Sequence, residues 1–422
     1  MFAPILRNRE FRAMALTEAM STVGDQLTRV ALALLVFDRT GSAGLGGLTY
    51  ALTFLPTVAG GLLLSPLADT RPRRSTLIAI DVLRGAAVLA MVAPGTPLVV
   101  LWSLVAFCAF LNGPYSAARL ALLRDVLSQD QYGAGMALRQ SLSQGAQLLG
   151  FLSGGLLASI FSPGTCLLFD CASFVGSALT LRIFVRPRPA ALSGGERSTV
   201  AGTVRLVWGS PVLRTVFLTT FTGLFFLGPD ALAAPLASEL SLSARWVGFF
   251  MASGGLFSVI GLAAFGRFVS ADRYLRAFPI SFLAPGLPLL PVVVVHDPIK
   301  ILILFGISGA AWAVLTVIAV TSFAGLLPDD QRGRAMGVAG SMNATSQGVG
   351  AFLAGLLADA VGVGCAISLL GAAGVLFALL AIAGWRRAVV NPTRSITGAR
   401  ATPDQHAKPD AAQPERPATY NS

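Results

Sequence analysis

The stretch Asp130–Ala158, DQYGAGMALRQSLSQGAQLLGFLSGGLLA, returns without a gap 200 positions later as Asp330–Ala358, DQRGRAMGVAGSMNATSQGVGAFLAGLLA. Eleven of the 29 paired positions are identical, more than a composition rich in Ala, Gly and Leu easily supplies. In both copies a polar Asp-Gln turn precedes a long run that contains many small residues. A chain of 422 residues that repeats itself at about half its length is expected to consist of two similar halves.

The composition indicates that these halves lie in a lipid bilayer. Charged residues are 12% of the chain, against about 25% in an average soluble domain, and the mean hydropathy is +0.72. Apolar runs of about 18 residues or more, enough to cross a bilayer as a helix, recur along the whole length. Because the two histidines and four scattered cysteines form no typical metal or disulfide pattern, we expect no metal and no other cofactor.

The apolar runs predict an all-α membrane protein with twelve transmembrane helices in two parallel six-helix repeats. The expected spans are approximately 11–37, 43–67, 75–92, 98–122, 132–160, 166–185, 212–236, 245–265, 276–295, 299–327, 335–360 and 362–385. They divide the chain into an N-terminal half (1–185), a cytoplasmic linker (186–211), a C-terminal half (212–385) and a disordered cytoplasmic tail (386–422).

The distribution of basic residues predicts the orientation. Loops on one side hold only Arg39, Arg245 and Lys300, whereas those on the other side hold many arginines. By the positive-inside rule the arginine-rich side and both termini are cytoplasmic. The same rule accounts for the net charge of +11 without nucleic-acid binding. We therefore expect a monomeric, multi-pass protein of the cell membrane (plasma or inner membrane).

Charged residues inside the spans are the candidate functional residues. In the first span, Glu18, Thr22, Asp25 and Arg29 are separated by four, three and four positions, which places them on one helical stripe. A charge at mid-bilayer costs about 2.5–3.5 kcal/mol, so this stripe must face a polar interior. Two interpretations remain open: a structural Asp25–Arg29 ion pair, or a polar lining that meets substrate or protons.

Buried carboxyl groups are the candidates for proton coupling, since a carboxyl in low dielectric can load and release a proton near neutral pH. In order of preference they are Asp25, Glu18 and Asp230, the last lying at a similar depth in the seventh span. The other acids are assigned structural roles, as polar anchors near span ends for Asp170 and Asp359, and as a pair within one helix for Asp81 and Arg84.

Two parallel six-span halves joined by a polar loop resemble the major facilitator superfamily of transporters. Residues 65–77 are similar to that superfamily's loop between spans two and three, with Asp69 as the helix-end acid and Arg73 and Arg74 as the basic pair. The resemblance implies that this loop latches a cytoplasmic gate and that its acid is tied to an arginine on span four, for which Arg119 is the candidate. These residues and Arg29 form the expected gate or structural charge network.

Four stretches are similar to the drug-exporter branch that contains the macrolide efflux proteins and the enterobactin exporter. They are 24–32 (GDQLTRVAL), 39–42 (RTGS), 113–119 (GPYSAAR) and 169–174 (FDCASF). Membership of this branch implies an antiporter that exports a bulky, partly hydrophobic compound against an inward proton gradient, as in multidrug resistance.

Small and aromatic residues suggest how such a carrier moves and binds. Glycines permit close helix contacts on which one half can rock against the other, with static packing as the alternative; those singled out are Gly150, Gly154, Gly155, Gly350 and Gly355. Aromatic residues are the candidate lining of a substrate cavity, with lipid or core contact as the alternative; they are Tyr50, Phe54, Phe107, Phe110, Phe225, Phe226 and Trp312.

The leading hypothesis is a proton-driven exporter of a small amphipathic molecule, such as an antibiotic, a siderophore or another secondary metabolite. The alternatives are an importer or facilitator of the same fold, and a membrane sensor that does not transport. An enzyme is not expected, because the chain contains no Ser/His/Asp set, metal cluster or phosphate-binding loop.

Overall fold

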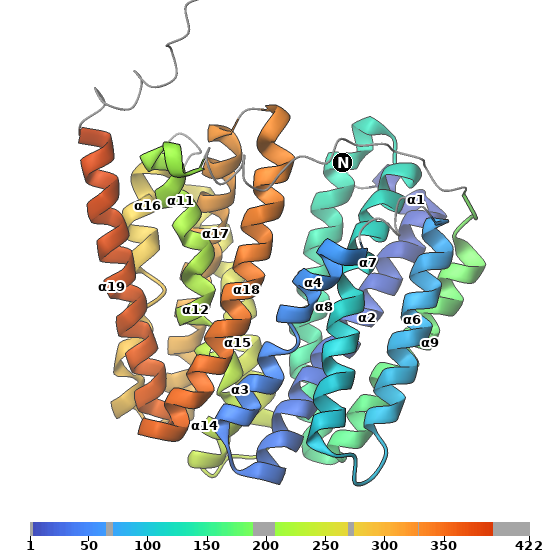
Figure 1. Ribbon diagram of the computed structural model, residues 1–422, viewed down its shortest axis with the longest axis horizontal. Helices are drawn as coiled ribbons and strands as arrows, with labels where there is room; N and C mark the ends of the chain where they lie inside the picture. Colours follow the sequence, from blue (N-terminus) through green and yellow to red (C-terminus); the bar gives the residue numbers. More distant parts are fainter. Residues whose placement is uncertain (1–2, 65–70, 189–206, 269–273, 328, 391–422) are drawn as a thin grey trace, which may run out of the picture.

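The computed structural model describes residues 3–64, 71–188, 207–268, 274–327 and 329–390, and in these ranges it contains helices and no strands. Ten helical segments there are long and apolar enough to cross a membrane. The more polar helices α6 and α8 complete the twelve spans of the described ranges. The helices stand side by side in two bundles (Figure 1), which confirms the predicted all-α membrane fold.

The first bundle contains the first six spans, with α3 and α4 together forming span two. Its elements are α1 (Ala3–Arg7), α2 (Arg9–Thr40), α3 (Ala43–Ala51), α4 (Leu55–Leu64), α6 (Arg73–Met91), α7 (Leu98–Val126), α8 (Gln129–Ile160) and α9 (Pro163–Phe184). At the start of α2, the side chain of Asn8 accepts a hydrogen bond from the backbone N–H of Glu10 at 2.9 Å. Gly41 ends α2 in the left-handed region, with φ of +65°.

The second bundle contains the last six spans, and span seven is divided among five short elements. The elements are α11 (Pro211–Leu218), η1 (Thr219–Thr222), α12 (Gly223–Phe226), α13 (Gly228–Ala231), α14 (Ala233–Glu239), α15 (Arg245–Phe268), α16 (Tyr274–Leu283), η3 (Leu287–Val294), α17 (Pro298–Leu326), α18 (Asp329–Val361) and α19 (Val363–Val390). Helix α19 thus continues five residues past the expected end of the last span at 385.

Three spans that were expected to be continuous helices are interrupted. Span two breaks between α3 and α4, just before Pro56, and span seven breaks around Gly228 and Pro229. In span nine, α16 gives way to the 3₁₀ helix η3, which contains Pro288 and Pro291. Proline removes a backbone donor and clashes with the preceding turn, which disfavours one continuous α-helix in these spans.

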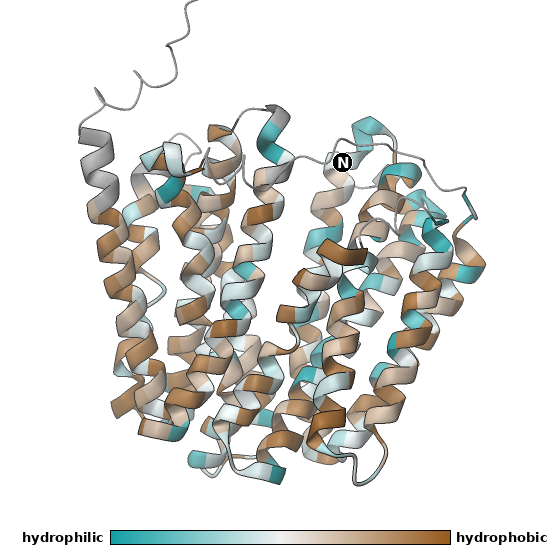
Figure 2. Ribbon diagram, viewed as in Figure 1, coloured by the Kyte–Doolittle hydropathy of each residue, from teal (hydrophilic) through white to brown (hydrophobic). Residues whose placement is uncertain are grey.

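The outer surface is apolar, as a lipid environment requires. Large hydrophobic side chains such as Leu62, Val99 and Ile280 are about two-thirds or more exposed. Figure 2 shows hydrophobic residues along the middle of the helices and hydrophilic residues gathered toward their ends. This arrangement supports a multi-pass membrane protein.

The two edges of the molecule differ in what they carry. Helix α1 and the end of α19 lie at the same edge (Figure 1), which we call the terminal edge. The turn between α2 and α3 lies at the other end of α2, at what we call the opposite edge.

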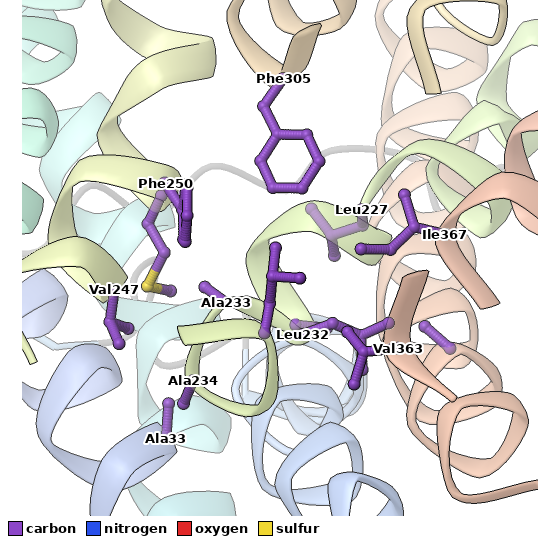
Figure 3. Packing of buried hydrophobic residues seen from close by; sticks show 14 of the residues in the cluster. Ala33, Leu227, Leu232, Ala233, Ala234, Val247, Phe250, Phe305, Val363 and Ile367 are labelled. Carbon is purple, nitrogen blue, oxygen red and sulfur yellow. The ribbon is translucent and has the colours of Figure 1, made fainter. Parts of the chain in front are cut away.

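The largest hydrophobic core joins the two bundles. It contains Val30, Tyr50 and Phe151 from the first bundle together with residues such as Leu232 and Phe250 from the second. Figure 3 shows Ala33 of α2 beside Ala234 of α14, close to Val247 of α15. The bundles therefore pack directly on each other through apolar side chains.

Candidate functional site

The acid at the centre of the span-one stripe pairs with a different helix from the one expected. Asp25 Oδ1 on α2 lies 2.6 Å from Arg84 Nη2 on α6, so the predicted Asp25–Arg29 pair within α2 is wrong as the main pairing. The predicted Asp81–Arg84 pair is wrong for the same reason, because Arg84 turns toward Asp25. Asp81 instead accepts a hydrogen bond from the hydroxyl of Ser177 at 2.6 Å.

Asp170 joins this site, although its sequence position suggested only a polar anchor. Its side chain on α9 is 1% exposed and accepts hydrogen bonds from Thr28 Oγ1 at 2.5 Å and Ser173 Oγ at 3.2 Å. Gly24 makes the approach possible, since a Cβ there would collide with the Asp170 carboxylate. The sequence signal for this contact was therefore Gly24, which lies one helical turn before Thr28 on span one and leaves room for a neighbouring helix.

These side chains surround a cavity of about 60 Å³ inside the first bundle. Its lining combines charged and polar groups with apolar ones: Asp25, Thr28, Arg29, Leu32, Thr53, Arg84, Val88, Met91, Val105, Cys108, Ala109, Asn112, Asp170 and Phe174. A polar cavity of this kind suits water or the polar group of a ligand. The lining contains two acids, Asp25 and Asp170, and two arginines, Arg29 and Arg84, so its formal charges sum to zero.

Arg29 lies on the side of this cavity that faces the second bundle. Its guanidinium carbon is 4.8 Å from the ring centre of Phe54 and 5.8 Å from that of Tyr50. One N–H group bonds Gln26 Oε1 at 3.3 Å within the same helix. Asp230 of α13 interacts electrostatically with Arg29 across the contact between the bundles.

Glu18, nearer the terminal edge, is held by two arginines. Its Oε1 lies 2.6 Å from Arg139 on α8 and 3.4 Å from Arg119 on α7. Arg119 also lies over the ring of Tyr115, 5.3 Å from its centre. The expected partner of Arg119, Asp69, falls outside the described residues.

The basic pair of the span two–three loop stays within the first bundle. Arg73 Nη1 lies 2.5 Å from Asp125 Oδ2 on α7. Arg74 donates to the backbone carbonyl oxygen of Arg182 on α9 at 2.5 Å. Both contacts join the start of α6 to the ends of neighbouring helices at the terminal edge.

Five of the seven candidate aromatic residues belong to or pack against the hydrophobic core between the bundles, and two lie outside it. Tyr50 and Phe54 lie together, with ring centres 5.6 Å apart, and both frame Arg29. In the same core, Phe226 is buried, Phe225 packs on Phe377, and Trp312 donates to Thr222 Oγ1 at 3.1 Å. Outside this core, Phe107 is 41% exposed and Phe110 lies where α7 meets α4.

The glycines that were singled out lie at close helix contacts of two kinds. A Cβ on Gly155 of α8 would lie 2.7 Å from Gly248 Cα of α15, in the other bundle, and one on Gly355 of α18 would lie 2.9 Å from Gly44 Cα of α3. The remaining three lie within one bundle: Gly150 and Gly154 against α2, and Gly350 against Gly223 and Leu224. Gly155 and Gly355 are 200 positions apart, so the two inter-bundle contacts, which we call seams, are equivalent in the repeat.

One seam carries a charged contact that the other lacks. The Asp359 carboxylate accepts hydrogen bonds from Ser42 Oγ (2.7 Å) and from the backbone N–H groups of Ala43 (2.7 Å) and Gly44 (2.9 Å). It thereby caps the first turn of α3 in the other bundle. Its equivalent in the repeat is Ser159, whose hydroxyl donates to the Leu156 carbonyl oxygen in its own helix at 2.7 Å.

Fold and site together define a membrane protein of two six-helix bundles, the first of which contains a charged cavity next to the contact with the second, the arrangement of a carrier. Comparison with known families agrees: the model of the Major Facilitator Superfamily matches residues 14–298. The chain belongs to that superfamily and is a transporter, not an enzyme.

The curated relatives share about a quarter of their residues with this chain. The multidrug efflux pump Tap of Mycobacterium tuberculosis (strain ATCC 25618 / H37Rv) is 26% identical over 378 residues, covering 81% of this chain and 85% of Tap. The MFS-type transporter YjbB of Bacillus subtilis (strain 168) is 23% identical over 398 residues, covering 90% of this chain and 96% of YjbB.

Solved structures share the fold at low sequence identity. A bacterial homolog of the human lysosomal transporter Spinster, in an inward-facing and unoccupied conformation, matches with a TM-score of 0.69 and 13% identity over 93% of this chain and 98% of that one. The nucleoside transporter NupG matches with a TM-score of 0.68 and 12% identity over 89% and 99%.

Proposed function

We propose that this chain is a proton-coupled antiporter that exports a small amphipathic or hydrophobic compound by alternating access. The observation that carries this proposal is the charged cavity around Asp25 and Arg84, which lies inside a membrane-spanning bundle and beside the second one. Charge at that depth is costly and typically serves transport. The similarity to the efflux pump Tap supports export of a drug, an antibiotic, a siderophore or another secondary metabolite.

Proton binding is assigned within the same set of carboxyl groups. Asp25 and Glu18 each have an arginine within 2.6 Å, so a proton must compete there with a guanidinium. Asp170 and Asp230 have no such partner within 4.0 Å among the described residues. We therefore place the coupling proton first on Asp170 or Asp230, and the two ion-paired acids after them.

Alternating access requires that the bundles rock about their contact. Both seams lie toward the opposite edge, where Gly155 meets Gly248 and Gly355 meets Gly44. With the arginine-rich terminal edge in the cytoplasm, this arrangement corresponds to a carrier closed on the outside. The substrate then enters from the cytoplasm, as export demands.

The proposal is tested by efflux from energised cells that express the protein, with a panel of toxic compounds and with a protonophore as the second condition. We expect protonophore-sensitive efflux that Asp170→Asn or Asp230→Asn abolishes. Asp297→Asn is the control, because Asp297 only caps the start of α17. Accumulation in place of efflux would indicate an importer, and an unchanged response to the protonophore would remove proton coupling.

A further inference from the structure

Arg29 differs from the other arginines that project into the first bundle. Arg84, Arg119 and Arg139 each lie within 4.0 Å of a carboxylate oxygen, whereas in the described ranges no carboxylate oxygen lies that close to Arg29. A guanidinium has five N–H donors; Arg29 uses one of them on Gln26 and has a side-chain hydrogen bond with Tyr50, which leaves further donors spare. A membrane-embedded cation with spare donors is costly unless an anion binds there.

The acids that share the cavity with Arg29 are already engaged. Asp25 pairs with Arg84 at 2.6 Å, and Asp170 accepts from Thr28 and Ser173. Asp230 acts on Arg29 only at longer range, from the other bundle. Because Arg29 lines the cavity and these acids are engaged elsewhere, an anionic group from outside the protein can approach it there.

The aromatic rings beside Arg29 indicate what kind of molecule carries the anionic group. Phe54 and Tyr50 cover the guanidinium at 4.8 Å and 5.8 Å, and both belong to the apolar core between the bundles. A ring face over the plane of a guanidinium leaves its N–H edge free for a planar oxyanion. An apolar or aromatic body joined to that anion would lie against the same two rings.

We propose that Arg29 is the residue that selects the substrate, and that the substrate carries a single carboxylate on an aromatic or apolar body. The Arg29 fork would hold the carboxylate by two parallel hydrogen bonds, with Tyr50 and Phe54 packed on the body. Multiply charged anions are disfavoured, because Asp25 and Asp170 line the same cavity. This inference rests on the proposed function, since it names the class of compound that the exporter carries.

The experiment compares two probes of nearly the same shape, an anion and its neutral amide: coumarin-3-carboxylic acid and coumarin-3-carboxamide. Binding is measured by fluorescence on the purified protein in lipid nanodiscs. We expect the wild type to bind the acid at least about ten-fold tighter than the amide, the size of a lost charge-assisted hydrogen bond. Arg29→Gln is expected to weaken acid binding by about that factor and amide binding by much less, so that the preference for the acid is lost.

The matched control is Arg39→Gln, which removes a positive charge from the same helix at the opposite edge, where Arg39 bonds the Thr96 carbonyl oxygen. It is expected to keep the preference for the acid. Equal affinities for acid and amide in the wild type, or an unchanged preference in Arg29→Gln, would overturn the inference. If Arg29→Gln fails to fold, Arg29→Lys decides, because lysine lacks the planar fork and an unchanged preference would again overturn it.

Efflux assays separate this inference from the proposed function. If the protein exports uncharged compounds and shows no preference for the acid, the role proposed for Arg29 is wrong, whereas the proposed exporter function stands. If the protein binds the acid preferentially but exports no compound, the proposed exporter function is wrong, whereas the role of Arg29 stands.

Discussion

At the scale of single residues, Arg84 is the cation that interacts with both acids of the cavity. Its side chain is 5% exposed and pairs with Asp25, while its charge also acts on Asp170. We expect Arg84→Gln to destabilise the folded protein by about 1–3 kcal/mol, because it leaves the partly exposed Asp25 without its partner. Thermal unfolding in nanodiscs would show this loss, and adding Asp25→Asn should recover part of it. An unchanged unfolding temperature in both variants would mean that the pair of Asp25 and Arg84 contributes nothing to stability.

Gly24 offers a second test at this scale. A methyl group at Gly24 would displace the Asp170 carboxylate and the Ser173 hydroxyl, so Gly24→Ala is expected to cost about 1–3 kcal/mol and to impair efflux. Gly46→Ala is the matched control, because a Cβ at this helical glycine meets no atom within 4 Å. Expression level, unfolding temperature and efflux are compared for the two variants. Equal behaviour would show that the contact between α2 and α9 tolerates movement.

The stripe of charges on span one could be predicted from the sequence, but the partners of those charges could not. Helical periodicity places Glu18, Asp25 and Arg29 on one face without saying which helix faces them. The partner of Asp25 is 59 residues away and the contact between Thr28 and Asp170 joins positions 142 apart. Short-range pairing rules favoured Arg29 and Asp81, and tertiary packing overrode them.

At the scale of elements, the seam between α3 and α18 is the one in which a carboxylate closes a helix end. We expect Asp359→Asn to raise the fraction of molecules open at the opposite edge by about ten-fold, since it removes charge from three hydrogen bonds. Spin labels at Val99 and Lys300, in different bundles near that edge, measure the opening.

Ser159→Ala is the control for this variant, because Ser159 occupies the equivalent place in the repeat and bonds only its own helix. Its label distances should match those of the wild type. If Asp359→Asn also matches the wild type, the cap does not hold the seam closed.

Close glycine contacts make the seam between α8 and α15 equally sensitive to substitution. A Cβ on Gly155 would lie 2.8 Å from the Arg245 carbonyl oxygen as well as 2.7 Å from Gly248 Cα, and backbone atoms cannot turn aside. Gly155→Ala is therefore expected to separate α8 from α15 and to lower efflux. Gly145→Ala on the same helix meets nothing within 4 Å and should leave efflux unchanged. Normal efflux in Gly155→Ala would mean that the seam is loose in the working protein.

At the scale of the whole molecule, the repeat and the hydropathy together were enough to predict the fold. A shift of 200 residues relates Gly155 to Gly355, and the structure places both at equivalent seams. The interruptions in spans two, seven and nine were not predicted, because hydropathy counts apolar residues and takes no account of prolines. The predicted gate contact of Asp69 lies outside the described residues.

Orientation in the membrane remains a prediction, and the arginines carry it. Arg73, Arg124, Arg267 and Arg332 lie at helix ends on the terminal edge. The opposite edge holds only Arg39, Arg245 and Lys300 among the described basic residues near helix ends there. Because basic loops resist translocation, we expect the terminal edge to face the cytoplasm.

Two single cysteines in a cysteine-free background test this orientation. Ala93→Cys lies in an exposed turn at the opposite edge, and Gly209→Cys lies at an exposed position before α11 at the terminal edge. A membrane-impermeant maleimide added to intact cells should label the first at once and the second only after permeabilisation. The reverse pattern would put the arginines outside. It would also turn the seams toward the cytoplasm, so the same structure would then be closed on the side from which an exporter must load.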